Sequence, residues 1–495
     1  MTSKRIGGLS GPDLAVLGLL LVLGLLLVPA PFTGDQALYA VGGDVLRSGG
    51  SMYGDFWDIK QPGIYLYFAA ATVLPGPDEV AVHLVDLAGL LVLAVLVRRV
   101  ADHLVEPLWL RRVAPLLVVG TYLAGARPSD LSQVELVVGL PLLASLWLAL
   151  GTPATGRYHT AALVASGALG ATVVVFKIVY LPIPLAFWLL AARRDRKALV
   201  PAAAGATAVI GAVVAWFAAT GVLHEVWYVY FDYSSGTTAS AGRPVSRLLG
   251  WGTYAPAVFS LTAPLALVGA WRSIRDRRDD PVVLGLLVWL FGGLGLVLVQ
   301  HWWAYHLMLF IVPAGLIAVI GVDALRGVAP RRLALAALIV LAVPGLVALA
   351  GRAGHLATHD LGVTSAQRNA YHAEEEPAYA TAADFARFVA RDSAAPGDVY
   401  VLANPLVQLG SDRDPAIAIN GWSPEQYDVE VWGRLGEQLL AADPPYIVID
   451  EASRPYLDER NPALAAELAD RYCQVEVEPL QVLARLDTAD CAPTG

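Results

Sequence analysis

The stretch "GDQALYAVGGDVLRSGGSMYGDFWDIKQPG", residues 34–63, decides how the rest of the chain is interpreted. It follows an apolar run at residues 14–32, yet it gathers ionisable side chains among aromatic ones: Asp35, Asp44, Arg47, Asp55, Asp58 and Lys60. The connection to the next long apolar run has about 50 residues, far more than an ordinary loop. Several of its apolar residues have helical spacing: Leu38, Val41, Val45 and Leu46. We therefore expect a structured segment at residues 33–79, with helices lying at a membrane surface.

Composition places the chain among membrane proteins. Hydrophobic residues make up 56% of its 495 residues and charged residues only 16%, whereas soluble domains average about 25% charged residues. Apolar runs near the length that crosses a bilayer recur along the chain: 14–32, 80–97, 113–125, 134–150, 160–176, 178–192, 200–221, 254–271, 282–299, 306–322 and 333–350. The sequence therefore predicts a polytopic α-helical membrane protein with about 11 transmembrane helices.

The distribution of Lys and Arg predicts the orientation of these helices. Positive residues favour cytoplasmic loops, and an N-terminus inside divides them as 18 inside against 6 outside. The first apolar run exceeds the core of a signal peptide, which has about 7–15 residues, so we expect it to remain as the first helix. An odd number of spans then places residues 33–79 and the C-terminus on the extracytoplasmic side.

Residues 351–495 have a different character. They hold 24 acidic and 10 basic residues, and no run among them is long enough to span a bilayer. Their short apolar runs suit buried strands or helices: "DVYVLA" (398–403) and "YIVID" (446–450) as strands, "ADFARFVARD" (383–392) and "ALAAELADRY" (463–472) as helices. We therefore expect a transmembrane catalytic domain at residues 1–350 and an extracytoplasmic α/β domain at residues 351–495.

Charge and cysteine content narrow the possible partners. The acidic C-terminal domain gives the chain a net charge of −9, so nucleic acid is not an expected partner. No glycine-rich phosphate-binding motif is present, so the sequence does not predict a cytoplasmic nucleotide-binding domain.

The only two cysteines, Cys473 and Cys491, fall in the acidic C-terminal domain. They form either a disulfide in an oxidising compartment or two free thiols.

Asp35 and Lys60 are the first candidates for chemistry. An Asp at the start of a helix is commonly its N-cap, and a Lys near a membrane surface often extends its ammonium toward the headgroups. Both ordinary interpretations stay open. The alternative is a general base beside a cation that serves an anionic ligand, and the carboxylates of Asp55 and Asp58 close to Lys60 in sequence favour it.

A set of residues in this stretch resembles the first outer loop of the GT-C class of integral membrane glycosyltransferases, above all the family 39 protein mannosyltransferases and the lipid A aminoarabinose transferases. The set is Asp35, Tyr39, Gly50, Tyr53, Asp55, Asp58, Lys60 and Pro62. Later outer segments extend the resemblance: Glu135 in "ARPSDLSQVELVVGLPLL", Lys177 in "VVVFKIVYLPIPL", and Tyr305, His306 and Pro313 in "QHWWAYHLMLFIVPAG". The resemblance implies a GT-C-like fold for the membrane domain.

The resemblance also implies a reaction. Such enzymes move a sugar from a polyprenyl phosphate to an acceptor hydroxyl on the outer face, usually with inversion. A carboxylate must accept the acceptor's proton, and cations must stabilise the leaving phosphate. Asp35 is the implied base. The implied phosphate contacts are Lys60, His306 and Lys177, and the implied supporting residues are Gln36, Tyr39, Tyr53, Asp55, Asp58, Glu135 and Tyr305.

These assignments have structural alternatives. Lys177 lies in apolar sequence and needs a partner, which Glu135 supplies as well as a ligand does. His306 is also compatible with a hydrogen-bonded core histidine. Gln36 stands where many relatives carry a second acidic residue, so a metal bridged by two adjacent carboxylates is not expected. No Cys or His cluster has metal-ligand spacing either, so we expect no essential cofactor and keep a divalent metal as an alternative.

The expected partners are a polyprenyl-phosphate-linked sugar, an acceptor glycan, lipid or protein, and the bilayer itself. The expected location is a bacterial plasma (inner) membrane, with many passes and an extracytoplasmic active site. Two other classes stay open. A transporter or lipid flippase places ionisable groups near the bilayer midplane and often has inverted repeats, whereas here the charges gather in outer loops and no repeat is seen. A catalytically inactive scaffold is disfavoured by Asp35 and Lys60.

Overall fold

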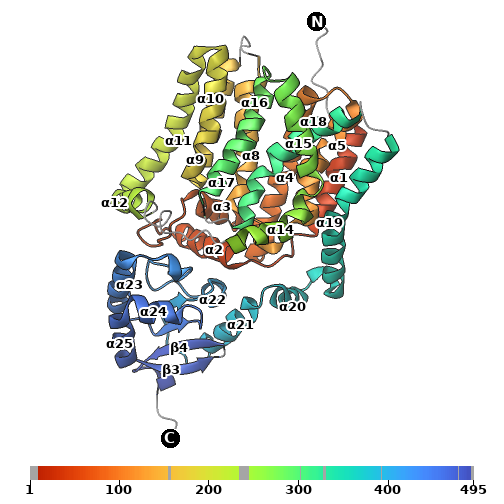
Figure 1. The fold of residues 1–495 in the computed structure, drawn as a ribbon. Helices are drawn as coiled ribbons and strands as arrows, with labels where there is room; N and C mark the ends of the chain where they lie inside the picture. Colours follow the sequence, from red (N-terminus) through yellow and green to blue (C-terminus); the bar gives the residue numbers. More distant parts are fainter. Residues whose placement is uncertain are drawn as a thin grey trace. The chain divides into compact units, whose positions relative to one another are not determined.

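The computed structural model of the chain describes residues 9–153, 158–233, 245–300, 303–326, 331–391, 393–477 and 479–491. The chain divides into two compact units (Figure 1). The first unit comprises Met1–Pro29, Val82–Val214 and Ala241–Thr358. The second unit comprises Ala30–Ala81, Ala215–Ser240 and His359–Gly495. The charged stretch after the first apolar run therefore shares a unit with the C-terminal part of the chain.

The first unit is a bundle of helices. Its helices, two of which have a few end residues in the second unit, are α1 (Gly11–Leu25), α4 (Asp78–Leu104), α5 (Leu108–Pro115), α6 (Thr121–Gly125), α7 (Val134–Val137), α8 (Gly139–Leu146), α9 (His159–Phe176), α10 (Pro182–Arg194), α11 (Leu199–Ala219), α14 (Val245–Phe259), α15 (Thr262–Asp276), α16 (Pro281–Leu287), α17 (Gly293–Leu298), α18 (Ile311–Arg326) and α19 (Arg331–Thr358). Four π- or 3-10-helical pieces continue some of them: Leu116–Gly120, Trp147–Gly151, Val288–Gly292 and Ala304–Phe310. In the part of the chain that the structure describes, 7 helical segments are long and apolar enough to cross a membrane.

The predicted polytopic helical fold is confirmed, while the number of spans and their orientation stay predictions. The apolar run at residues 254–271, expected as one span, falls on two helices, because α14 ends at Phe259 and α15 begins at Thr262. Pro264 lies in the first turn of α15, where its missing N–H needs no partner. The last expected span, 333–350, is part of α19, which continues to Thr358.

Close helix contacts in the first unit depend on small residues. At the contact between α15 and α18, a Cβ on Gly269 would overlap the backbone carbonyl of Ile317, and a Cβ on Gly321 would overlap that of Leu265. Only glycine allows the two backbones to approach this closely. Small residues serve the same purpose wherever membrane helices pack without a hydrophobic driving force between them.

The second unit combines helices from the charged stretch with an α/β region. Its helices are α2 (Gly34–Arg47), α3 (Gly63–Ala71), α12 (Leu223–Trp227), a π-helical turn (Tyr228–Tyr233), α20 (Ser365–Glu375), α21 (Ala378–Val389), α22 (Leu406–Gly410), α23 (Val429–Ala442), α24 (Arg454–Arg460) and α25 (Pro462–Arg471). Its strands are β1 (Val399–Leu402), β2 (Tyr446–Ile449), β3 (Tyr472–Val477) and β4 (Leu480–Arg485). The sheet has the order β1-β2-β4-β3.

The predicted α/β region is confirmed element by element. The two runs expected as strands form β1 and β2, which pair in parallel from Val399 opposite Tyr446 to Leu402 opposite Ile449. All residues of both strands are buried, as expected for apolar runs inside an α/β sheet. The antiparallel hairpin of β3 and β4 completes the sheet. The two runs with helical spacing fall in α21 and α25.

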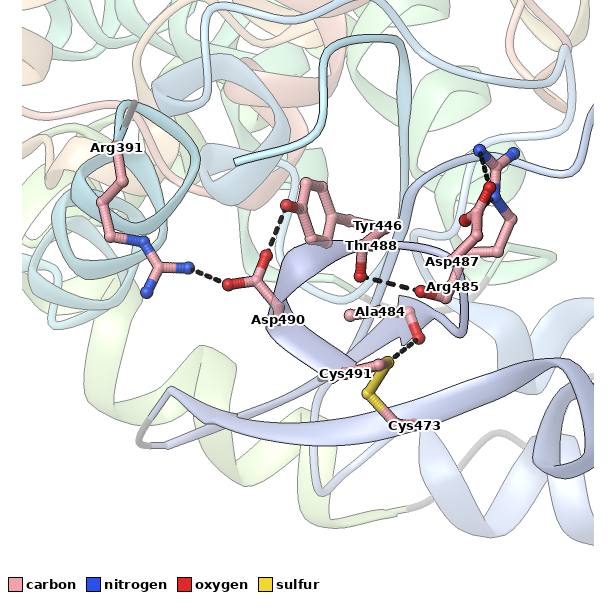
Figure 2. The surroundings of a disulfide bond; sticks show 9 residues. All are labelled: Arg391, Tyr446, Cys473, Ala484, Arg485, Asp487, Thr488, Asp490 and Cys491. Carbon is pink, nitrogen blue, oxygen red and sulfur yellow. Dashed lines mark hydrogen bonds and ion pairs between the residues drawn. A yellow bond between two sulfur atoms is a disulfide. The ribbon is translucent and has the colours of Figure 1, made fainter. Parts of the chain in front are cut away.

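A disulfide fixes the C-terminal end of the described chain to this sheet. Figure 2 shows Cys473, on β3, bonded to Cys491 in the final 3-10 turn. Asp490 beside it accepts a hydrogen bond of 2.6 Å from the Tyr446 hydroxyl and pairs with Arg391 at 2.8 Å. Of the two alternatives that the sequence left open, the disulfide is confirmed and the pair of free thiols is wrong.

The helices expected in the charged stretch are also present. On α2, Leu38 and Val41 are buried, as their helical spacing predicted. The ring of Tyr39 meets those of Tyr65 and Phe68 on α3 edge to face, with centroids 5.7 and 5.4 Å apart. Such aromatic pairs stabilise a fold beyond the area that they bury. α2 and α3 are therefore one packed layer, and its polar edge carries the candidate site.

Candidate active site

Asp35 lies in the first turn of α2 without capping it. The N-cap is Thr33, whose backbone N–H and hydroxyl donate to Oε1 of Gln36 at 2.5 and 3.0 Å. A Thr and a Gln three positions apart form a capping box, which satisfies the free N–H groups of a helix start. The interpretation of Asp35 as the N-cap is therefore wrong. Gln36, fully buried, has this structural function, and its expected part in the site stays a prediction.

Lys60 lies between two carboxylates. Its Nζ is 3.7 Å from Oδ1 of Asp35 and 3.5 Å from Oδ2 of Asp58, and it faces the ring of Tyr39 at 5.4 Å from the centroid. Burial by itself lowers the pKa of Lys60, but the carboxylates of Asp58 and Asp35 outweigh burial and hold that pKa above its ordinary value. The ammonium thus stays charged at any physiological pH.

Asp58 has a second donor that sequence reasoning missed. The hydroxyl of Tyr65, on α3, donates to Oδ2 of Asp58. Burial, and then the charge of Asp58, raise the pKa of Tyr65 well above its ordinary value, so the hydroxyl remains a donor. With a residue exposure of 6%, Asp58 is a buried carboxylate compensated by one ammonium and one hydroxyl. No motif in the sequence marks Tyr65, which lies seven positions after Asp58 in the apolar run that forms α3.

Two other candidate site residues of the charged stretch, Tyr53 and Asp55, stabilise the loop that carries Lys60. Asp55 accepts hydrogen bonds from the backbone N–H and the hydroxyl of Ser51, at 2.7 and 2.8 Å. Tyr53, in a left-handed conformation with φ of 71°, is buried and donates its hydroxyl to the carbonyl of Lys60 at 2.9 Å. Both residues shape the loop, and direct substrate contacts for them stay predictions.

The candidate base has a contact with the C-terminal region that the sequence did not predict. The indole Nε1–H of Trp422 donates to Oδ1 of Asp35 at 3.0 Å. The two residues are 387 positions apart in the chain, so no local pattern predicts their contact. Oδ1 of Asp35 thus faces two donors, Trp422 and Lys60, whereas no hydrogen bond of Oδ2 is seen among the described residues. The side chain of Asp35 is 19% exposed, which leaves Oδ2 able to accept a proton from a ligand.

The first unit holds a separate cluster of candidates. Oε1 of Glu135, on α7, accepts from Nζ of Lys177 and from the hydroxyl of Tyr180, both at 2.7 Å. Nε2 of His306 lies 3.5 Å from that Nζ and 3.8 Å from the same Oε1. Tyr305 meets the His306 ring edge to face at 4.8 Å. The structure thus brings these sequence candidates together and adds Tyr180.

Burial decides the character of this cluster. Glu135 is 1% and His306 4% exposed, whereas the Lys177 side chain is 24% exposed. Lys177 has an extended conformation between α9 and the 3-10 turn Ile178–Tyr180, which aims its side chain at the start of α7. The structural partnership with Glu135, one of the two alternatives for Lys177, is observed. The ligand role of Lys177 and His306 stays a prediction.

A pair of side chains in the second unit has the chemistry of metal ligands. Nε2 of His359 lies 3.2 Å from Oε2 of Glu374. An ordinary ion pair has the same geometry, and Glu374 is largely exposed to solvent. The expectation of a metal-independent site therefore stays a prediction.

Comparison with known proteins identifies the fold. No protein-family model and no curated protein sequence matches the chain. The chain is structurally similar to ArnT from Cupriavidus metallidurans, with 16% identity over 95% of this chain and 97% of that chain; the TM-score is 0.60 for ArnT bound to undecaprenyl phosphate and 0.59 for its apo state. It is also similar to the archaeal oligosaccharyltransferase AglB from Archaeoglobus fulgidus, in complex with an inhibitory peptide and a dolichol-phosphate. That match has 12% identity and a TM-score of 0.50, and it covers 93% of this chain and 72% of that chain. The chain therefore shares its fold with ArnT and AglB, and the fold expected from its resemblance to the GT-C class is confirmed.

Proposed function

We propose that the chain is a membrane glycosyltransferase that moves a sugar, hexose or pentose, from a polyprenyl-phosphate donor to an acceptor hydroxyl of a cell-envelope glycan, lipid or protein. The observation that carries the proposal is the state of Asp35. Its carboxylate is not used as a helix cap, one of its oxygens faces an indole N–H and an ammonium, and its side chain is 19% exposed. The shared fold supports the proposal, because ArnT was crystallised with undecaprenyl phosphate.

The proposed reaction is a single displacement. The acceptor oxygen attacks the anomeric carbon and passes its proton to Oδ2 of Asp35, while the bond from that carbon to the phosphate oxygen breaks. The polyprenyl phosphate leaves with the bonding electrons, so its charge must be stabilised as it develops. One base suffices for such an inversion, and no second carboxylate has to act as a nucleophile.

Lys60 is the proposed phosphate contact in the second unit. Its contacts with Asp35 and Asp58 are 3.7 and 3.5 Å long, well beyond the roughly 2.7–2.9 Å of a strong charge-assisted hydrogen bond. Its N–H groups are thus available to an incoming anion. For the first unit, we propose separately that Lys177 and His306 contact a donor phosphate.

We further propose that the protein resides in a bacterial plasma membrane with the reaction on the outer face. Two observations support this side. The excess of Lys and Arg in alternate loops favours an N-terminus inside. The disulfide of Cys473 and Cys491 suits an oxidising compartment, because thiols in the cytoplasm are kept reduced.

The test is transfer of radiolabelled sugar from polyprenyl-phosphate donors to native membrane acceptors, using the purified wild type and Asp35→Asn. We expect Asp35→Asn to lower the rate by about 10²- to 10⁴-fold, the usual contribution of a general base. The matched control is Asp44→Asn on the same helix, where the Asp44 carboxylate pairs with Arg47 at the surface. Equal transfer by the wild type and Asp35→Asn would show that the base lies elsewhere, and no transfer from any donor would favour a transporter or scaffold.

A further inference from the structure

Trp422 is the side chain of the C-terminal region that touches the proposed base. It lies in the segment between β1 and α23, and its indole N–H donates to Oδ1 of Asp35 at 3.0 Å. An indole N–H is a donor only and does not titrate. It can hold a carboxylate oxygen in place without competing for the proton that a general base has to accept.

The backbone around Trp422 is fixed by contacts with the loop that carries Lys60. The N–H of Trp57 donates to the carbonyl of Ala418 at 2.8 Å, and the side-chain amide of Asn420 donates to the carbonyl of Trp57, also at 2.8 Å. Oδ1 of Asn420 in turn accepts from the backbone N–H of Trp422 at 2.8 Å. The indole is thus attached to the same loop as the cation of the site.

Gly34 provides the space that the indole needs. A Cβ at Gly34 would overlap the six-membered ring of Trp422. Gly34 directly precedes Asp35 and is the first residue of α2, where an alanine would favour the helix. The missing side chain of Gly34 therefore leaves the space in which the ring of Trp422 lies beside Asp35.

Two other tryptophans of this unit have an indole N–H without a hydrogen-bond partner in the described part of the chain. The Nε1 atoms of Trp57 and Trp432 are buried without a hydrogen-bond partner among the described residues. Trp422 is half-buried, and its N–H donates to Asp35. Its contact with Asp35 is therefore a specific feature of the site.

We propose that Trp422 is a positioning residue that orients the carboxylate of Asp35, so that Oδ1 is held and Oδ2 faces the acceptor hydroxyl. The C-terminal α/β region then contributes a side chain to the active site. This inference rests on the proposed function, in which Asp35 is the general base.

The test compares Trp422→Phe, Trp432→Phe, Gly34→Ala and Asp35→Asn with the wild type in the sugar-transfer assay and in thermal unfolding. Trp422→Phe keeps a ring against Gly34 but removes the donor. We expect kcat to fall by about 10- to 100-fold, the value of one hydrogen bond to a charged group, with the donor KM within about 2-fold. Trp432→Phe makes the same chemical change where the N–H has no partner, and should leave kcat unchanged. Gly34→Ala should lower kcat as Trp422→Phe does, because its methyl group displaces the indole.

Each contrary result has a distinct meaning. If Trp422→Phe keeps the wild-type kcat while Asp35→Asn is inactive, the positioning role is refuted and the proposed function stands. If Trp422→Phe is slow but Gly34→Ala is not, or if Trp432→Phe is equally slow, the effect is one of general packing and the positioning role is refuted. If Asp35→Asn transfers at the wild-type rate, the proposed base and the role of Trp422 fail together.

Discussion

Replacing Lys177 by methionine separates a structural ion pair from a ligand contact. Lys177→Met removes the ammonium 2.7 Å from Oε1 of Glu135 and leaves a carboxylate that is 1% exposed. The hydroxyl of Tyr180 still donates to that oxygen and Nε2 of His306 lies 3.8 Å from it, but neither replaces an ammonium at 2.7 Å. Breaking a buried ion pair on one side costs about 3–5 kcal/mol, and we expect this loss in the free energy of unfolding.

The double variant Glu135→Gln/Lys177→Met removes both charges. A neutral amide can keep the hydrogen bond to Tyr180, and replacing both members of a buried pair is often neutral in stability. We therefore expect the double variant to regain most of the lost stability. The measurement is denaturant-driven unfolding in detergent micelles, followed by tryptophan fluorescence, as a double-mutant cycle.

Sugar transfer by the same variants then tests the ligand role. If Lys177 only compensates Glu135, the double variant regains the transfer rate along with its stability. If Lys177 also contacts the donor phosphate, the double variant is stable and slow. The reasoning is refuted if Lys177→Met lowers stability by less than about 1 kcal/mol, or if the double variant is as unstable as the sum of the single variants.

Four further predictions follow from the second unit. Lys60→Met should raise the donor KM about tenfold and also lower the melting temperature, because Asp58 is 6% exposed and keeps the hydroxyl of Tyr65 but loses its ammonium; an unchanged KM would contradict this. Because the pKa of Lys60 lies above its ordinary value of 10.5, its contribution to stability is complete below that pH and is lost as the pH rises through the higher folded-state value, so melting temperatures from pH 6 to 9 should show no step from this group. Cys473→Ser should lower the stability of the α/β region by about 3 kcal/mol, since the disulfide closes a loop between residues 18 positions apart; mild reduction of the wild type should match it in hydrogen exchange. A chelator such as EDTA should leave transfer unchanged if lysine ammonium groups alone stabilise the phosphate, whereas loss of activity restored by one divalent metal would overturn the metal-independent proposal.

Local patterns predicted the elements of this fold well, because they carry their own physical signal. The length and apolarity of a run such as residues 80–97 predicted the long helix α4, and the short apolar runs at 398–403 and 446–450 predicted β1 and β2. The capping box of Thr33 and Gln36 also has a local signal, a Thr followed three residues later by a Gln at the start of a helical pattern. The break between α14 and α15 was missed because hydropathy alone does not register a proline in the first turn of a new helix.

The contacts within the site were predictable only in part. Family motifs selected Asp35, Lys60 and Asp58, and the structure brings these three side chains together. Tyr65 and Trp422 were missed for a different reason. The bond of Trp422 to Asp35 joins residues 387 positions apart and leaves no periodic or compositional trace in a single sequence. Tyr65 is only seven positions from Asp58, but it lies in an apolar run in which no motif marks it.

Distances assign different properties to the two lysines. Lys177 forms a 2.7 Å contact with a carboxylate that is almost fully buried, so most of its electrostatic attraction is already used within the protein. Lys60 lies more than 3.4 Å from either of its carboxylates, and both carboxylates have a second donor that does not depend on it. An anion that approaches Lys60 therefore gains an ammonium without leaving a buried carboxylate unsatisfied, whereas an anion that approaches Lys177 competes with Glu135. Of the two, Lys60 is the side chain that a leaving phosphate can engage at the lower cost, and the loop held by Tyr53 and Asp55 keeps it beside the proposed base.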